Sequence, residues 1–421
     1  MDVDEVLASS IAAKLRPKPP LSSQACIFRV PHVLSSQSEG AFAPTIVSIG
    51  PFHHGHENLK SMEEFKLWYL HGLLSRAPTP ETSLKVFTKA IRQLEKCARE
   101  CYAEELIDLD KDGFVEMMLV DGCFIIELFR KKANGIEGVQ RDDPISNTPW
   151  MDTYLRVDLM LPENQIPWFV LECLFNITEP PIQRSHSLTK LALNFFDTMM
   201  PMTIPAKLSS RHETKHLLDL LWSSIISDSA DVELTLENDQ YWEIIPSVTD
   251  LVEAGVKFRK GNSNEEILNI RFKDGVMEIP PFLIQGSTER LFRNLIAYEQ
   301  CNYLLPNRIT SYVVLLDCLL NSSKDVHLLG EKGIIENWLA TEEDASLFFS
   351  RLWKCATLHK FYYVGICQKV NAYYRTSWHK WRATLKRDYF NNPWTIISLI
   401  GAIVLLILTF LQTIFSILSY H

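Results

Sequence analysis

Residues 114–132, FVEMMLVDGCFIIELFRKK, decide the fold class of this chain. The segment is apolar nearly all round when its residues are placed on a helix, and a helix without a polar face has to be surrounded by other parts of the protein. It therefore predicts a buried central helix. Amphipathic helical patterns occur at 59–74 and 84–106, so we expect a mainly α protein whose helices pack around this segment.

Residues 150–160 and 166–175 form the next helical patterns, with a break at LPENQIP between them. Proline cannot continue the interior of a helix, whereas asparagine is a good N-cap. We expect Asn164 to cap a helix that begins near Ile166. We expect Glu163 and Gln165 to bond to nearby backbone groups, which makes the triplet a structural motif.

Extended structure is predicted in two places. The runs IFRVPHVL and APTIVSIGPFHHG, between residues 27 and 55, contain short β-branched stretches cut by proline and glycine, which favours brief strands or extended segments at the edge of a helical body. The run 267–284 has Asp274-Gly275 between two alternating segments, which predicts a tight β-hairpin. After it, an amphipathic pattern from 342 to 386 predicts a long helix.

The length of 421 residues permits one large domain or two. RPKPPLSSQ suggests a flexible lead-in over 1–24. We expect a helix-rich soluble domain at 25–387, with a possible subdomain boundary at 179–240, and a juxtamembrane segment with an anchor at 388–421.

The anchor is predicted from residues 394–420, WTIISLIGAIVLLILTFLQTIFSILSY, which carry no formal charge. As a helix, their apolar core spans roughly 34 Å, against about 30 Å for the hydrocarbon layer of a bilayer. We therefore expect one C-terminal transmembrane helix with the bilayer as partner. Its representative anchor residues are Trp394, Ile396, Leu405, Phe410 and Leu418.

Basic residues before this segment set the expected orientation, because positive charge favours the cytosolic side of a membrane. They predict a single-pass, tail-anchored protein with a cytosolic N-terminal region, in the plasma membrane or the endoplasmic reticulum. The basic residues are Arg375, Lys380, Arg382, Lys386 and Arg387.

Net charge and cysteine usage exclude some function classes. A net charge of -9 argues against a nucleic-acid-binding protein, whose phosphate contacts need clustered lysine and arginine. Nine scattered cysteines are an odd number, and several lie in apolar helical runs, which is typical of reduced core thiols. We expect no cofactor.

Two patterns resemble metal sites, although we predict none. Residues 212–216 read HETKH, in which His212 and His216 on a helix could bind zinc beside Glu213 as general base, but Lys215 places a cation between them. This supports a metal-dependent hydrolase only as an alternative.

The second pattern, Asp108, Asp110 and Asp112 before Gly113, reproduces half of a calcium loop. Its twelfth position is Leu119 instead of a carboxylate, which favours an ordinary acidic turn.

The ordered segments together resemble a plant family known as domain of unknown function 247. The similarity rests on VSIGPFHHG, MMLVDGCFIIELFR, DLMLPENQIPWFVLECLF, IPSVTDLVEAGVKFR, FRNLIAYEQC and the C-terminal apolar stretch, and it runs from about Cys26 to the end. Pro162 departs from the family, which usually has an aliphatic residue there. The resemblance implies a membrane-bound plant protein of unassigned activity, and some grass members resemble the male determinants of self-incompatibility.

The expected function is therefore that of a non-enzymatic recognition or scaffold protein. No phosphate-binding glycine loop, nucleophile elbow or cysteine–histidine pair composes an active site in the sequence. Its helical domain would present a surface to one or more protein partners, whose identity the sequence does not give.

Overall fold

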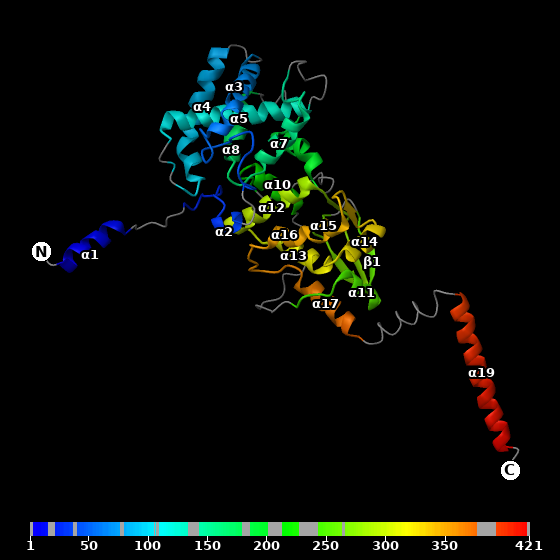
Figure 1. The fold of residues 1–421 in the computed structure, drawn as a ribbon. Coiled ribbons are helices and arrows are strands. Elements are labelled where there is room, and N and C mark those ends of the chain that lie inside the picture. Colours follow the sequence, from blue (N-terminus) through cyan, green and yellow to red (C-terminus); the bar gives the residue numbers. More distant parts are fainter. Residues whose placement is uncertain are drawn as a thin grey trace. The chain divides into compact units, whose positions relative to one another are not determined.

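Helix α5 (Lys111–Ala133) contains the 114–132 segment and lies at the centre of the N-terminal helices (Figure 1). Most of its residues are buried. Four helices pack against it: α3 (Ser61–Leu74), α4 (Pro80–Glu100), α8 (Trp168–Thr178) and α9 (Leu188–Phe196). The prediction of a central buried helix is confirmed.

The structure is a computed structural model, and the chain divides into two compact units. The first comprises 1–232, 285–310 and 352–360, and the second comprises 233–284, 311–351 and 361–421. The residues described are 3–15, 22–36, 40–75, 80–104, 106, 109–133, 143–178, 186–200, 213–226, 243–262, 266–376 and 393–418. The lead-in, the boundary at 179–240 and the juxtamembrane segment therefore fall partly outside the described residues.

The first unit is helical. Besides the helices around α5 it contains α1 (Val3–Lys14), α2 (His32–Ser35), η1 (Glu57–Leu59), α7 (Pro149–Leu159), η3 (Asp197–Met199), α10 (Leu217–Ile225) and α12 (Gly286–Cys301). Helix α1 lies in the predicted lead-in, where the sequence pattern did not indicate a helix. Helix α7 ends before Pro162, as the ring of that residue requires.

The second unit combines helices with two small sheets. Its helices are α11 (Val248–Glu253), α14 (Ser323–Glu331), α15 (Glu342–Ser346), α17 (Val364–Arg375) and α19 (Pro393–Leu418), while α13 (Arg308–Leu319) and α16 (Phe348–Trp353) cross the division between the units. In the first sheet, β3 (Val276–Ile279) lies between β1 (Lys257–Lys260), parallel to it, and β2 (Arg271–Lys273), antiparallel. The second pairs β4 (Phe282–Ile284) with β5 (Ile335–Asn337) in parallel.

The predicted hairpin is confirmed. Strands β2 and β3 pair in antiparallel register, with Phe272 opposite Met277. Asp274 and Gly275 connect them with φ angles of 51° and 73°. Two consecutive positive φ values match the right-handed twist of the flanking strands, and the pair Asp-Gly adopts them at low cost.

The prediction of one long helix over 342–386 is wrong. The described part of this run forms three separate helices, α15, α16 and α17. The break after α16 has a tertiary cause. The Gln300 side chain accepts hydrogen bonds from the Thr357 N–H at 2.8 Å and hydroxyl at 2.9 Å, and donates to the Thr357 carbonyl at 3.0 Å. These contacts satisfy the backbone at Thr357 without a helix.

The predicted membrane anchor is contradicted. Its residues lie in α19, where Leu405 and Phe410 are exposed. Nowhere in the described ranges does a helix reach the length and apolar character that a membrane crossing requires. The prediction relied on the long uncharged run 394–420, of which the structure describes the part up to Leu418. The predicted transmembrane element of the fold class is therefore wrong. The same finding contradicts the single-pass, tail-anchored topology and the predicted membrane location.

Candidate functional site: a buried polar network and a basic helix face

Residues 45–50, in the first unit, lie outside every helix and strand that the structure describes, so side chains have to satisfy their backbone groups. Asp158, on α7, does this for three of them. Its carboxylate accepts hydrogen bonds from the N–H groups of Thr45, Ile46 and Val47 at 2.9, 2.7 and 3.0 Å. A buried carboxylate with this many donors is held firmly in place.

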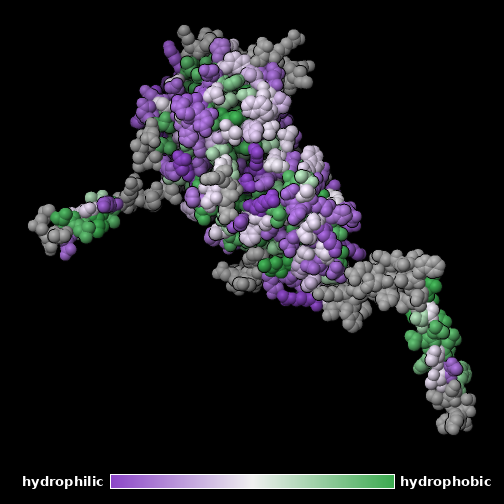
Figure 2. Space-filling model, viewed as in Figure 1, coloured by the Kyte–Doolittle hydropathy of each residue, from purple (hydrophilic) through white to green (hydrophobic). Residues whose placement is uncertain are grey.

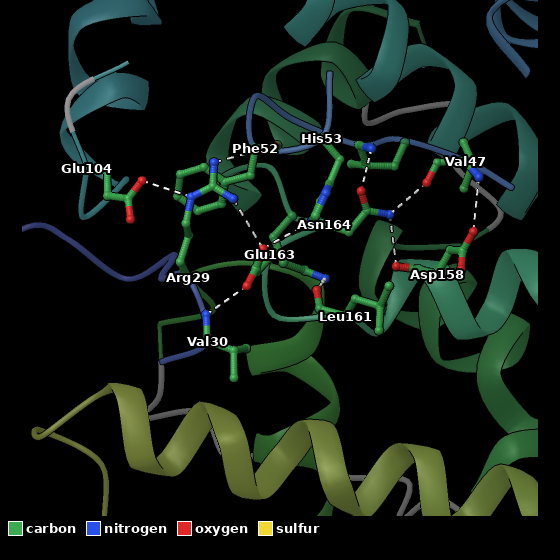
Figure 3. A network of polar contacts seen from close by, with 12 residues as sticks. Arg29, Val30, Val47, Phe52, His53, Glu104, Asp158, Leu161, Glu163 and Asn164 are labelled. Carbon is green, nitrogen blue, oxygen red and sulfur yellow. Dashed lines mark hydrogen bonds and ion pairs between the residues drawn. The ribbon is translucent and has the colours of Figure 1, made fainter. Parts of the chain in front are cut away.

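Asn164 continues the same arrangement (Figure 3). Its side-chain oxygen accepts from the Ile49 N–H at 2.6 Å. Its amide nitrogen donates to the Val47 carbonyl and to the Asp158 carbonyl, both at 3.0 Å. Asn164 is 1% exposed, and it joins the segment 45–50 to the C-terminal end of α7.

Lys66 completes the network from α3. Its ammonium group donates to the Ser48 carbonyl at 2.5 Å, to Glu63 at 2.7 Å and to Asp121 at 2.7 Å, and the other Asp121 oxygen accepts from the Gly50 N–H at 2.8 Å. Burial disfavours the ammonium form, but the two carboxylates outweigh it and raise the pKa of Lys66. This lysine therefore stays protonated.

Glu163 contacts residues that lie earlier in the chain, between 29 and 53. Its carboxylate accepts from the Val30 N–H at 2.9 Å and lies 3.1 Å from the His53 ring and 3.4 Å from Arg29, which also pairs with Glu104 at 2.9 Å (Figure 3). Burial alone would raise the pKa of Glu163, but His53, the Val30 N–H and Arg29 together lower it. Glu163 is therefore ionised near neutral pH.

The predicted helix cap at Asn164 is not what the structure shows. Helix α8 begins at Trp168, and the side chain of Asn164 bonds to residues far away in sequence instead. Sequence proximity suggested the cap because asparagine often takes that role.

Gln165 bonds to backbone groups, as expected, although over a wider range. Its amide nitrogen donates to the carbonyls of Leu159 and Leu161, both at 2.9 Å. Its side-chain oxygen accepts from the Leu218 N–H at 3.1 Å, at the start of α10. The three residues 163–165 thus connect α7, α10 and the segment 45–50.

Gly50 has a steric role in this network. Its φ angle is +73°, and an added Cβ would overlap with the Gln165 carbonyl oxygen. At Gly55, where φ is +79°, an added Cβ would have no atom within 4 Å. The two glycines share a positive φ and differ in the available space.

We expect Gly50→Ala to destabilise the protein by at least about 2 kcal/mol more than Gly55→Ala, for which the positive φ alone costs roughly 1 kcal/mol. The excess comes from the clash with the rigid Gln165 carbonyl. Urea unfolding of both variants measures the difference. Equal midpoints would show that the segment can move away from Gln165 at little cost.

The HETKH pattern does not form the helix that a zinc site needs. His212 lies outside the described residues, and α10 begins only at Leu217. His216 is buried and caps this helix, accepting from the Asp219 N–H at 3.3 Å, while its other ring nitrogen lies 3.1 Å from the Cys26 carbonyl oxygen. Glu213 is exposed and pairs with Lys215.

The described aspartates of the calcium-loop pattern, Asp110 and Asp112, lie at the N-terminal end of α5. Asp110 accepts from the Gly113 N–H at 2.7 Å, and Asp112 pairs with Arg92 at 2.6 Å, whereas Asp108 lies outside the described residues. In the described ranges, no three histidine, cysteine or acidic side chains gather as a metal site would require.

The basic cluster before α19 is described only at its first residue. Arg375 pairs with Glu243 at 2.8 Å within the second unit. The remaining members, Lys380, Arg382, Lys386 and Arg387, lie outside the described residues.

A different basic surface lies on α4, and it was not among the predicted sites. Four exposed basic side chains follow one another at the spacing i, i+4, i+7 and i+11: Lys85, Lys89, Arg92 and Lys96. The side chains at the same spacing on the opposite side are buried or partly buried: Phe87, Ile91, Leu94 and Ala98. We call the first set the α4 basic face. The helical period of 84–106 could have revealed it.

Hydrophilic residues cover much of the outward side of α4 in Figure 2. A shallow groove there is lined by three members of the basic face together with Leu84 and Thr88. Leu84 and Val86 are exposed to 41% and 46%. The surface therefore combines positive charge with apolar contact area, which suits an amphipathic acidic ligand.

Comparison with known proteins places this chain in a family. The family described as DUF247, plant protein of unknown function, matches residues 27–408. The UPF0481 protein At3g47200 of Arabidopsis thaliana is 32% identical, over 94% of this chain and 87% of its own length. The putative UPF0481 protein At3g02645 of the same plant is 24% identical, over 92% and 89%. No solved structure matches. The chain therefore belongs to the DUF247 family of plant proteins of unknown function.

Proposed function

We propose that this protein is a non-enzymatic recognition or scaffold protein, and that the α4 basic face binds an acidic segment of a partner protein. The observation that carries the proposal is the regular line of basic side chains on a helix of a chain whose net charge is -9. A cluster of positive charge on one face of an otherwise acidic protein attracts negatively charged ligands selectively to that face.

The helix that presents this face is rigidly held. Phe87 and Ile91 are at most 2% exposed, and α4 packs against α5. At the C-terminal end, the Arg99 guanidinium donates to the Leu109 and Asp110 carbonyls at 2.9 Å and lies 4.3 Å from the centre of the Phe114 ring. Binding to a preformed helix face costs little ordering entropy.

The chemistry of the face favours a protein over a nucleic acid. Four basic residues on one helix allow only a few phosphate contacts, and the acidic remainder of the chain would repel a long polyanion. Leu84 and Val86 offer apolar contacts that a short amphipathic peptide can use. Membership of the family also suggests a link to recognition, since some of its grass members resemble the male determinants of self-incompatibility.

The test uses the full chain and a fluorescent amphipathic peptide of glutamate and leucine. Its dissociation constant is measured by anisotropy at two salt concentrations. We expect the triple charge reversal Lys85→Glu, Lys89→Glu and Lys96→Glu to weaken binding at least about tenfold, since each exposed contact contributes up to roughly 1 kcal/mol.

A matched control reverses three exposed lysines elsewhere in the chain, Lys190→Glu, Lys273→Glu and Lys332→Glu, with the same change in net charge. This control should keep most of the binding. If both triple variants lose peptide binding equally, the effect comes from net charge alone and the proposal is wrong. Tighter binding of a single-stranded oligonucleotide or of anionic lipid vesicles to the same face would replace the protein partner by that ligand.

A further inference from the structure

We infer that Cys26 and Cys101 form a redox-active dithiol pair, which a peroxide converts to an intramolecular disulfide. The pair lies in the first unit, where the beginning of the family-matching region meets the C-terminal end of α4. The inference does not depend on the proposed function of the α4 basic face.

The backbone brings the two residues opposite each other. Ile27 and Tyr102 form a parallel β-bridge, and the Cys101 carbonyl accepts from the N–H groups of Cys26 and Ile27 at 2.9 and 3.0 Å. Backbones paired in this way lie about 4.8 Å apart. Disulfides need about 4.4–6.8 Å between Cα atoms, so a cross-link requires little backbone movement.

The thiols interact already in the reduced state. The neighbouring Cys26 thiol lowers the pKa of Cys101, and the nearby Lys215 ammonium lowers it further, while the Cys101 thiol donates to the Cys97 carbonyl at 3.4 Å. The neighbouring Cys101 thiol, together with burial, raises the pKa of Cys26. Cys101 is therefore the better nucleophile, and Cys26 is placed to resolve its oxidised form.

The chemistry balances with hydrogen peroxide as the oxidant. The Cys101 thiolate attacks one peroxide oxygen, the O–O bond breaks, and the hydroxide released takes up a proton to become water. The sulfenic acid left on Cys101 is then attacked by the Cys26 sulfur, which loses its proton. The S–S bond forms and a second water departs. Two thiols are oxidised by two electrons, and one peroxide is reduced.

The disulfide would fix the chain where it enters the buried network. The Cys26 carbonyl already contacts His216, and Val30, four residues on, bonds to Glu163. Closing the loop from 26 to 101 restricts the unfolded chain. We therefore expect the oxidised protein to unfold at a higher temperature than the reduced protein, so oxidation would act as a stabilising switch on this segment.

The test treats the reduced, full-length protein with hydrogen peroxide, blocks remaining thiols by alkylation and maps peptides by mass spectrometry. We expect a peptide pair linking Cys26 to Cys101 that is two hydrogens lighter than its reduced components. In the variant Cys26→Ser, dimedone should trap a sulfenic acid on Cys101. Lys215→Gln should slow disulfide formation several-fold, while the matched surface variant Lys190→Gln should leave its rate unchanged.

Two residues serve as internal references in the wild-type protein. Cys97 is exposed one turn before Cys101, and Cys123 is fully buried in α5. The inference is overturned if the cross-link joins Cys97 to Cys101, or if Cys26 and Cys101 are both recovered alkylated after peroxide treatment. Because the cross-link is mapped in the wild-type protein, a variant that fails to fold does not alter this outcome.

Discussion

Lys66→Met is expected to lower the free energy of unfolding by about 3–5 kcal/mol, because it leaves Asp121 as a buried charge without its partner. Lys66 and Asp121 are 0% and 1% exposed, and their charged atoms lie 2.7 Å apart. The methionine side chain fills similar space but donates no hydrogen bond, so the Ser48 carbonyl also loses its donor. Urea denaturation followed by circular dichroism measures the change.

A double-mutant cycle separates the ion pair from simple packing. Asp121→Asn in the Lys66→Met background removes the unpaired charge and keeps an acceptor for the Gly50 N–H. We expect the double variant to be more stable than the sum of the two single losses predicts, by at least about 1 kcal/mol. The control Lys60→Met removes an exposed pair with Glu57 and should change stability by less than about 0.5 kcal/mol. Strict additivity would mean that the two charges do not stabilise each other.

Local patterns predicted the features that depend on neighbours in sequence. The apolar surface of 114–132 identified α5 as the buried helix, and Asp274-Gly275 identified the hairpin. In both cases the physical determinant is contained in a short window: a helix without a polar face, or two residues that tolerate positive φ.

Long-range partners explain what the sequence did not predict. The donors and acceptors of residues 45–50 are satisfied by side chains at 66, 121, 158 and 164. A hydrogen bond between residues far apart in the chain leaves no periodic signal, so the sequence suggested only a brief strand or an extended segment here. The same reason accounts for Asn164, whose local preference indicated a cap.

The α4 basic face is the opposite case. Its spacing is present in the sequence, but basic residues one turn apart do not form a cluster along the chain, so a search for runs of charge passes over them. Only the burial of Phe87 and Ile91 fixes which side of the helix faces outward. Placing charges on a helical projection after assigning the apolar face would have found it.

Asn164→Ala is expected to lower the free energy of unfolding by about 3–9 kcal/mol, the sum of roughly 1–3 kcal/mol for each of three buried partners left without a hydrogen bond. The partners are the Ile49 N–H and the carbonyls of Val47 and Asp158. Cellular abundance of the variant should fall along with its melting temperature, because less of it is folded. Thermal unfolding monitored by fluorescence measures the shift.

The same variant decides whether residues 163–165 are a structural element or a binding determinant. Gln93→Ala removes an exposed amide from α4 and should leave the melting temperature unchanged. If Asn164→Ala melts like Gln93→Ala and the wild type but no longer binds the acidic peptide, the side chain recognises a ligand, and the functional site moves from α4 to 163–165. The buried contacts of Asn164 predict the other outcome. The variant loses much of its stability but still binds the peptide at temperatures where it is folded. In that case the network holds the segment 45–50 in place, and recognition belongs to the helix face outside it.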